Sequence, residues 1–405
     1  MKILVLAGGA DQIALINELK SRGHYVILAD YFQNPPAKIY ADKHIVASTL
    51  DLARVEEIAV QEKVGLICTA CTDQALLTVA YVSEKLGLPC YLDYKSGLNV
   101  TNKSYMKSVL TINGIPTAKY VVLGKEDDYL RSLSDFKYPI VVKPVDCNSS
   151  KGVKKVYKPE ECDKFLNEAI EYSRTKTAIV EEYKEGDEVS ADFYIEHGIA
   201  KLLSATKSQK IKNRNSFTIL SSIYPAVTIQ QEKELVNVAS NIARAFSLDN
   251  TPLLVQLIVN DNEMNVIEFS ARMGGGSKYK LIQVLSGVNI MSKYVDRVLG
   301  EYPELTPSKQ VDYAQMVYVY CNPGIFERIE GFKSLKEDGI VDEYFVYKTE
   351  GMEIRAAETS GDRPAGYLCT GRSENELREK VKIADKRIKV ISTDGSDIMI
   401  HSLLN

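Results

Sequence analysis

Hydrophobic and polar positions follow two alternating patterns over the first quarter of the chain. Short apolar runs, which are typical of buried strands, alternate with stretches that carry apolar residues every three or four positions and so predict helices. The expected strands are Lys2–Ala7, Tyr25–Asp30, Ile45–Ala47 and Val64–Cys68, and the expected helices are Asp11–Arg22, Asp51–Glu62 and Gln74–Leu86. Strands that alternate with helices predict a parallel, doubly wound sheet, and therefore an α/β domain over residues 1–98.

The pattern changes near residue 99, where strands become the commoner element. Helices are expected at Asn102–Thr111, Pro159–Tyr172 and 231–246. The expected strands are Tyr120–Leu123, Ile140–Lys143, Lys154–Val156, Ala178–Glu182, Glu188–Glu196, Ile199–Ser204, 219–224, Leu253–Val259 and Asn265–Ser270. This pattern predicts an α+β domain with antiparallel sheets over residues 99–303. The polar stretch Lys207–Thr218 shows neither period and predicts a mobile loop, either a lid over an anionic substrate or a plain solvated loop.

The last quarter of the chain predicts a further strand-rich domain. Pro303 and Pro307 indicate a linker, and residues 304–405 follow it. Strands are expected at Asp312–Tyr320 and Val341–Tyr347, and a helix at Ser373–Lys386. The expected fold class is therefore mixed, with an α/β domain at the N-terminus, an α+β middle region and an α+β domain at the C-terminus.

Composition narrows the function classes. A chain of 405 residues with 45% hydrophobic content is long enough for two or three domains with buried cores. The formal net charge of −4 argues against a nucleic-acid binder. The opening apolar run, Met1–Leu6, is too short for a signal peptide or a membrane helix, so we expect the cytosol and no membrane partner.

The cysteines raise a separate question. Seven are scattered along the chain, as expected for free thiols in a reducing compartment. Cys68 and Cys71 form a CxxC sequence, which could be a redox or metal pair. The alternative, which we favour, is a strand end followed by a turn, because the sequence contains no second CxxC to complete a zinc site.

The first strand-to-helix turn contains Gly8 and Gly9 but lacks the third glycine of a dinucleotide fingerprint. Asp30 ends the second strand, where a ribose-binding acid would lie. A nicotinamide-dependent oxidoreductase is therefore an alternative, for which only half of the dinucleotide-binding signature is present. The simpler interpretation is a tight turn that could bind a small anion at the helix N-terminus.

Two segments suit phosphate and ribose. Lys143 ends a strand and is followed by the loop 146–152, which is rich in hydroxyl groups and closes on glycine; such loops offer several donors to phosphate oxygens. Glu181 and Glu188 lie seven positions apart across a turn at Gly186, so both carboxylates could meet one ligand edge with an amino group and a diol. Taken alone, these segments could also be a surface lysine and an acidic hairpin.

A third segment suits a hard metal ion. Gln256 and Glu268 are expected on neighbouring strands of a hairpin, and Mg²⁺ takes oxygen ligands of these types. Glu268 lies on an otherwise apolar strand and would be costly to bury without a partner. A metal ion would explain it; a structural salt bridge with Arg272 is the alternative. The glycines at 274–276 follow as a flexible loop that suits an anion.

These segments, in this order, resemble the ATP-grasp superfamily, and more narrowly its carbamoyl-phosphate-synthetase-like and L-amino-acid-ligase-like members. The resemblance runs over nearly the whole chain and rests on Lys103, Lys143, Glu181 with Glu188, Gln256, and the segment Glu268–Arg272. It implies an N-terminal Rossmann-like domain, a central ATP-grasp fold in two lobes and a C-terminal domain.

The resemblance also implies roles for particular residues. Lys103 and Lys143 match the two phosphate-binding lysines. Lys143 and Arg272 match the groups that lie nearest the transferred phosphoryl group. The loop residues that match the phosphate flap are Ser149, Ser150 and Gly152. The hinge that reads adenine, largely by its backbone, matches Glu181, Glu182, Tyr183 and Lys184. Glu188 matches the ribose-binding acid.

The metal ligands implied by the resemblance are Gln256, Glu268 and Ser270. The family segment usually reads Glu-x-Asn-x-Arg, so Ser270 stands in the asparagine position, where a hydroxyl would bind Mg²⁺ more weakly. The flap also lacks the usual run of glycines before its serines. The implied cofactors are ATP and Mg²⁺, with Mn²⁺ as a substitute.

The implied activity is that of an ATP-dependent, ADP-forming carboxylate–amine ligase. It would activate a small carboxylic or amino acid as an acyl phosphate and form an amide or peptide bond. Three alternatives stay open: another ATP-grasp reaction (carboxylation through carboxyphosphate, or ligation of a purine-pathway amine), a non-catalytic nucleotide-binding module, and the oxidoreductase described above. The expected partners are small-molecule substrates, with a homodimer as the default assembly.

Overall fold

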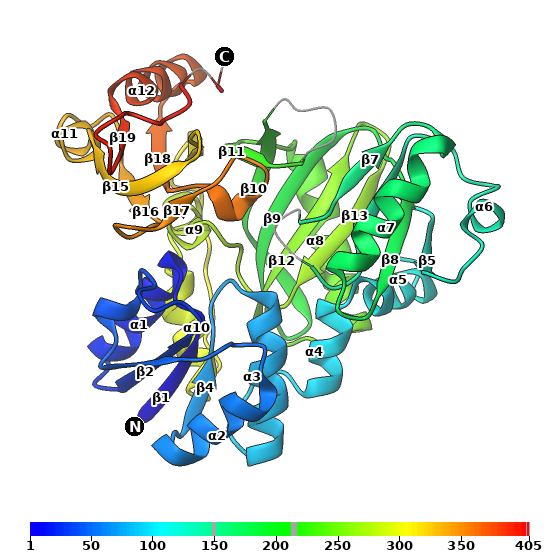
Figure 1. Ribbon diagram of the computed structural model, residues 1–405, viewed down its shortest axis with the longest axis horizontal. Coiled ribbons are helices and arrows are strands. Elements are labelled where there is room, and N and C mark those ends of the chain that lie inside the picture. Colours follow the sequence, from blue (N-terminus) through cyan, green and yellow to red (C-terminus); the bar gives the residue numbers. More distant parts are fainter. Residues whose placement is uncertain (148–150, 212–216, 402, 405) are drawn as a thin grey trace.

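The computed structural model describes residues 1–147, 151–211, 217–401 and 403–404, and its strands form four sheets. In Figure 1 the N-terminal domain (blue) lies below the large central sheet, a smaller lobe lies at the right, and the C-terminal strands lie at the upper left. Within the described ranges, no helix combines the length and the apolar character that crossing a membrane requires.

The N-terminal domain is built on a parallel sheet in the order β3-β2-β1-β4. Its strands are β1 (Lys2–Leu6), β2 (Tyr25–Asp30), β3 (Lys43–Val46) and β4 (Leu66–Cys68), and its helices are α1 (Ala10–Ser21), η1 (Lys38–Tyr40), α2 (Leu52–Glu62) and α3 (Asp73–Leu86). The strands carry continuous buried runs, such as Ile3–Leu6, as expected of a sheet covered on both faces. The predicted Rossmann-like sheet is confirmed.

A small lobe follows, linked by two helices, α4 (Tyr94–Thr101) and α5 (Lys103–Ile112). Its antiparallel sheet has the order β5-β8-β6-β7. Its elements are β5 (Tyr120–Gly124), α6 (Tyr129–Ser132), β6 (Ile140–Pro144), β7 (Lys154–Val156), η2 (Pro159–Glu161), α7 (Cys162–Tyr172) and β8 (Thr177–Glu182). Val142 and Val180 pack against Leu166 of α7. Since side chains alternate along a strand, their neighbours Lys143 and Glu181 lie on the opposite face.

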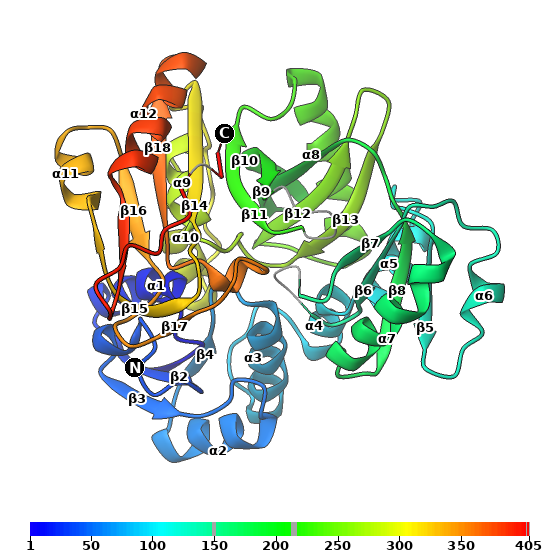
Figure 2. The ribbon, with the colours of Figure 1, turned by 45° about the horizontal axis from the view of Figure 1, so that its top comes forward.

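The large sheet contains eight strands in the order β13-β12-β9-β10-β11-β14-β18-β16. Its first half comprises β9 (Asp187–Glu196), β10 (Ile199–Lys210), β11 (Ile219–Tyr224), β12 (Thr251–Val259) and β13 (Met264–Ser270), with the helices α8 (Ile229–Ala245), α9 (Lys278–Ser286) and α10 (Ile290–Val298). Helix α8 starts in a capping box of Thr228 and Gln231, and its Leu235 and Ile242 join the core with Phe193 of β9. In Figure 2 the small lobe lies at the right of this sheet.

The C-terminal region continues the same sheet, with β14 next to β11 and β18 next to β14. Its elements are β14 (Tyr313–Val319), β15 (Gly324–Glu330), α11 (Phe332–Glu337), β16 (Glu343–Val346), β17 (Glu353–Ile354), η3 (Ser360–Asp362), β18 (Ala365–Gly371), α12 (Glu374–Arg387) and β19 (Lys389–Ser392). Strands β17, β15 and β19 form a separate small sheet. The predicted fold class, α/β and α+β, is confirmed, while the domain boundaries near 98 and 303 stay predictions.

One predicted loop is wrong in part. Lys207–Lys210 are not loop residues: they extend β10, where Lys207 pairs with Ile223 and Ser208 with Ser222 of β11. The strand was hidden because its buried positions include Thr206 and Ser208, which are polar. Residues 212–216 of the predicted lid lie outside the described ranges.

Candidate nucleotide and metal site

A cavity of about 440 Å³ lies between the small lobe and the large sheet. Lys103 and Lys143 line it from the small-lobe side, and Gln256 and Glu268 line it from the hairpin of β12 and β13. Apolar side chains complete its walls: Ala118, Val141, Val153, Phe217, Ile219 and Ile258. Charged groups that converge on a cleft with apolar walls are common in cofactor sites.

Lys143 is held by an ion pair on the floor of this cavity. Its Nζ lies 2.9 Å from Oε2 of Glu181, and the Nζ of Lys107 lies 3.1 Å from the other carboxylate oxygen. All three side chains are buried. No role was predicted for Lys107, although it lies four positions after Lys103 and therefore on the same face of α5.

The pKa values of Glu181 and Lys107 are both shifted in this cluster. Burial would raise the pKa of Glu181, but Lys107 and Lys143 hold it below its usual range. Burial, with Lys143 adding to it, lowers the pKa of Lys107 to about 8 although Glu181 opposes the shift. The carboxylate therefore stays ionised and fixes the position of the Lys143 ammonium group.

The Glu181 side chain is thus engaged with lysines, and the rest of the predicted hinge follows it along the cavity wall. The amide of Glu182 donates to the Lys119 carbonyl, and that of Tyr183 donates to the Pro139 carbonyl. Among the described contacts, none accepts a hydrogen bond from the amide of Lys184, which also lines the cavity. The backbone at Lys184 is therefore the available donor for a base; adenine reading by this hinge stays a prediction.

Glu188 lies at the start of β9, on the cavity wall, where the ribose-binding acid is expected. Its Oε2 lies 2.6 Å from the Nζ of Lys210 on β10. The carboxylate is therefore oriented by a neighbouring lysine that the sequence analysis assigned to a loop. Its role toward a ribose stays a prediction.

The loop after Lys143 is described only in part. Ser149 and Ser150 lie outside the described residues, so their predicted contacts with phosphate stay predictions. Gly152 has a φ of +71°, and a Cβ at this position would lie 2.9 Å from the ring of Pro144. At the start of the loop, the Nζ of Lys103 donates to the Cys147 carbonyl over 2.7 Å, so one predicted phosphate lysine contacts the predicted flap.

The three predicted metal ligands come together as expected. Gln256 and Glu268 are direct partners in the register of β12 and β13, and Ser270 follows two positions later on the same face. They line a second, smaller cavity of about 30 Å³. An amide oxygen, a carboxylate and a hydroxyl are hard oxygen donors, so this set fits Mg²⁺ or Mn²⁺. Glu268 also lies 3.0 Å from the Nζ of Lys103, and this pair keeps the pKa of Lys103 above its usual value despite burial.

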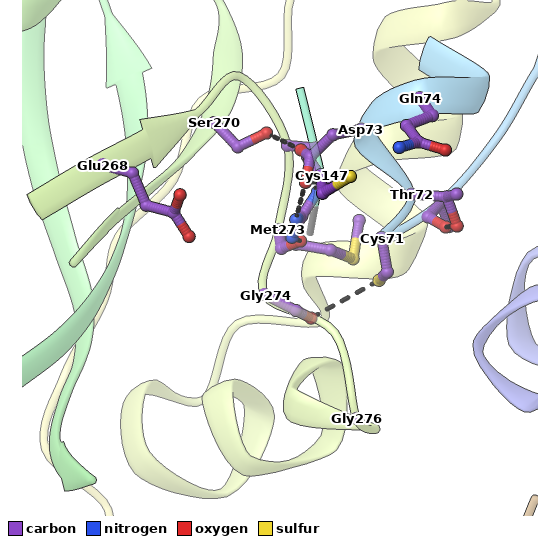
Figure 3. A network of polar contacts seen from close by, with 12 residues as sticks. Cys71, Thr72, Asp73, Gln74, Cys147, Glu268, Ser270, Met273, Gly274 and Gly276 are labelled. Carbon is purple, nitrogen blue, oxygen red and sulfur yellow. Dashed lines mark hydrogen bonds and ion pairs between the residues drawn. The ribbon is translucent and has the colours of Figure 1, made fainter. Parts of the chain in front are cut away.

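Arg272 meets a carboxylate that the sequence analysis did not identify. Its Nε and Nη2 lie 2.7 and 2.5 Å from the two oxygens of Asp73, in the first turn of α3. The hydroxyl of Ser270 donates to the same carboxylate, and Figure 3 shows Asp73 turned toward Ser270. Burial would raise the pKa of Asp73, but Arg272 outweighs it and the pKa is lowered. The alternative considered for Glu268, a salt bridge with Arg272, is wrong: Glu268 pairs with Lys103, and Arg272 pairs with Asp73.

The CxxC and the first glycine turn have structural roles. Cys68 is the buried last residue of β4, and the Sγ of Cys71 donates to the Gly274 carbonyl over 3.4 Å, which ties α3's N-terminal turn to the loop after Arg272 (Figure 3). The amide of Gly8 donates to Asp30 over 2.7 Å, and a Cβ on Gly8 would lie 2.6 Å from Pro35. Asp30, the residue that would bind ribose in the oxidoreductase alternative, therefore accepts a hydrogen bond from the glycine turn of its own domain.

Arginines of the C-terminal region could also bind a substrate carboxylate, and one of them lies near the site. Arg363 stacks over Tyr318 at 4.0 Å, beside the Gly276 turn that follows Arg272. Arg355 is exposed and pairs with Glu353, and Arg372 is exposed.

The two lobes with a cavity between them have the arrangement expected of an ATP-grasp fold. Residues 136–280 match the family model of the ATP-grasp domain, so the chain carries such a domain. The phosphoribosylamine–glycine ligase of Halalkalibacterium halodurans is 22% identical over 373 residues, which span 87% of this chain and 85% of that relative.

Solved structures share the fold over nearly the whole chain. An L-amino acid ligase from Bacillus licheniformis aligns with a TM-score of 0.78 at 20% identity, covering 97% of this chain and 98% of that one. The biotin carboxylase domain of the Hydrogenobacter thermophilus 2-oxoglutarate carboxylase, solved with MgADP and bicarbonate, aligns with a TM-score of 0.80 at 16% identity, covering 98% and 91%. The predicted resemblance to ATP-grasp proteins is confirmed, and C–N ligases are among the relatives.

Proposed function

We propose that this protein is an ATP-dependent, ADP-forming ligase that joins a small carboxylic or amino acid to an amine. The observation that carries the proposal is the meeting of two half-sites in one cavity. Lys103 and Lys143 line it together with Gln256 and Glu268, although the sequence separates the two pairs by more than a hundred positions. The names of the ligases among the relatives support the same activity.

Each residue has a physical task in this proposal. Lys103 and Lys143 would neutralise phosphate oxygens, and Arg272 would lie beside the transferred phosphoryl group. Gln256, Glu268 and Ser270 would hold Mg²⁺, which when bound neutralises charge on the β- and γ-phosphates. The Glu181 carboxylate holds Lys143 in place, so little reorganisation is needed during the reaction.

The proposed reaction has two steps. A carboxylate oxygen of the acid attacks the γ-phosphorus, the bond to the ADP oxygen breaks, and an acyl phosphate forms. The amine nitrogen then attacks the acyl carbon, the C–O bond breaks, phosphate leaves and the nitrogen loses a proton. The protein positions the reactants and excludes water.

Hydroxylamine trapping tests this proposal without knowledge of the amine. The protein, MgATP and hydroxylamine would be incubated with a panel of amino acids and other small carboxylic acids, and hydroxamate and ADP would be measured. Hydroxamate that depends on one acid and on MgATP supports the proposal and identifies the acid. ATP binding with neither hydroxamate nor ADP from any acid would overturn it in favour of a non-catalytic module.

Two other ATP-grasp reactions have specific support. The relative from Halalkalibacterium halodurans is named for phosphoribosylamine and glycine, so glycine belongs in the panel with phosphoribosylamine as the amine. The biotin carboxylase neighbour was solved with bicarbonate, so ADP release that requires bicarbonate and yields no hydroxamate would indicate carboxylation. The cytosol as location and a homodimer as assembly stay predictions.

A further inference from the structure

Ser270 poses a chemical problem at the metal position. An amide oxygen offers its lone pairs to a cation without interference, whereas a hydroxyl carries a proton that must point away from the cation. A serine therefore needs a nearby acceptor for its proton if it is to ligate a metal well. Ser270 is buried, so water is a poor candidate for that acceptor.

Asp73 is the acceptor that the structure provides. The hydroxyl of Ser270 donates to Oδ1 of Asp73, a residue 197 positions away in the N-terminal domain. Arg272 fixes both oxygens of Asp73 from the other side, at 2.7 and 2.5 Å. The carboxylate is therefore anchored and cannot easily rotate away from Ser270.

The same residues surround the small cavity beside the nucleotide site. Asp73, Lys103, Gln256, Glu268, Ser270 and Arg272 all line its space of about 30 Å³. This is room for one water molecule or one cation. Asp73 thus belongs to the wall of the cation position, although it comes from a different domain than the three predicted ligands.

We propose that Asp73 is a positioning residue of the metal site: it accepts the hydrogen bond of the Ser270 hydroxyl and so turns an oxygen lone pair of Ser270 toward the cation held with Gln256 and Glu268. This inference rests on the proposed MgATP site and adds to it a residue for which the family resemblance gave no role. It also explains how a serine can stand in the asparagine position. Outer groups that orient a ligand commonly change metal affinity by about 10- to 100-fold.

The competing explanation is that Asp73 only neutralises Arg272. The two explanations differ in what Ser270→Asn should do. An asparagine ligand has an amide oxygen and needs no acceptor for a proton, so Asp73 should become dispensable for metal binding. If Asp73 only neutralised Arg272, its loss would affect metal binding equally with serine or asparagine at position 270.

The test is a double-mutant cycle read by ATP binding, without any second substrate. Equilibrium dialysis with labelled ATP would measure the Mg²⁺ concentration that gives half-maximal binding for the wild type, D73A, S270N and D73A/S270N. We expect D73A to raise this concentration about tenfold or more. We expect D73A/S270N to match S270N. An unchanged Mg²⁺ requirement in D73A, or the same shift with Asn at position 270, would overturn the proposal.

D73A leaves Arg272 without its partner and could fail to fold. Circular dichroism and thermal melting without Mg²⁺ and ATP would reveal this. In that case R272M and D73A/R272M are compared, because neither leaves an unpaired cation; a higher Mg²⁺ requirement in the double variant supports the proposal, and equal requirements overturn it. Wild-type protein that binds no ATP at any Mg²⁺ concentration would instead overturn the proposed function, and this inference with it.

Discussion

Lys143 and Glu181 lie on adjacent antiparallel strands with the lysine Nζ 2.9 Å from the carboxylate, and the same carboxylate meets Lys107 on its other side. Two cations and one anion are thus buried together, with one positive charge in excess. A nucleotide phosphate would complete the balance, since Lys143 also faces the cavity. The cluster therefore links the stability of the small lobe to the charge of its expected ligand.

The first prediction concerns Glu181→Gln. This substitution removes the carboxylate that pairs with both buried lysines, and breaking a buried pair in this way costs about 3–5 kcal/mol. We expect the free energy of unfolding, measured by urea denaturation near pH 7, to fall by about that amount. Glu185→Gln is the matched control, because Glu185 is exposed beyond the end of the same strand. An equal, small effect of both substitutions would contradict the importance of the cluster.

The second prediction concerns pH. The pKa of Lys107 is lowered from 10.5 to about 8 in the folded protein. Between these values the unfolded chain binds more protons than the folded one, so this lysine makes the folded state more stable as pH rises from about 8 to 10.5. The slope is at most about 1.4 kcal/mol per pH unit.

Lys107→Met isolates this contribution from other titrating groups. The difference in unfolding free energy between the wild type and K107M should change over that pH range in favour of the wild type. Urea denaturation at pH 7, 8, 9 and 10 measures it. A difference that is flat across these values would show that Lys107 keeps its ordinary pKa in the folded protein.

The third prediction concerns Glu268→Ala. The carboxylate is the strongest predicted metal ligand and the partner of Lys103, so its loss should abolish ATP turnover and weaken Mg²⁺-dependent ATP binding by at least about tenfold. The Glu268 side chain is 31% exposed, and Lys103 keeps its hydrogen bond to the Cys147 carbonyl, so the fold should survive. Glu234→Ala on α8, which is exposed, is the control. Turnover close to wild type in E268A would remove this site assignment.

Much of this fold could be predicted because the signals are local. Buried runs such as Ile3–Leu6 and the hairpin that pairs Gln256 with Glu268 each lie within a short stretch of sequence. Lys207–Lys210 were missed because polar residues occupy buried positions of that strand, so hydrophobic alternation fails there.

The site was predicted less completely, for a different reason. The order of motifs shared with the ATP-grasp superfamily located the residues that line the cavity. It did not locate the residues that hold them in position through ion pairs and hydrogen bonds. Asp73 follows Thr72 at the start of a helix, where an acid is expected for local reasons alone. Its contact with Arg272, 199 positions away, follows from how two domains pack, which no short stretch of sequence encodes.

The last prediction concerns the turn after Arg272. Gly276 has a φ of +74°, and a Cβ there would lie 2.7 Å from Nη2 of Arg363 and 2.8 Å from the hydroxyl of Tyr318. Gly276→Ala therefore adds crowding to backbone strain, whereas Gly23→Ala, at a φ of +78° with open space around it, adds strain alone. Strain at such a position costs about 1 kcal/mol, so we expect G23A to lose about that and G276A to lose at least about 1 kcal/mol more. The Gly276 amide also donates to Asp11 of the N-terminal domain over 3.0 Å. The extra loss of unfolding free energy in G276A therefore measures how strongly the contacts of this turn with Asp11 and Arg363 resist displacement. Urea denaturation of both variants decides it, and equal losses would mean that Arg363 and Tyr318 move aside freely.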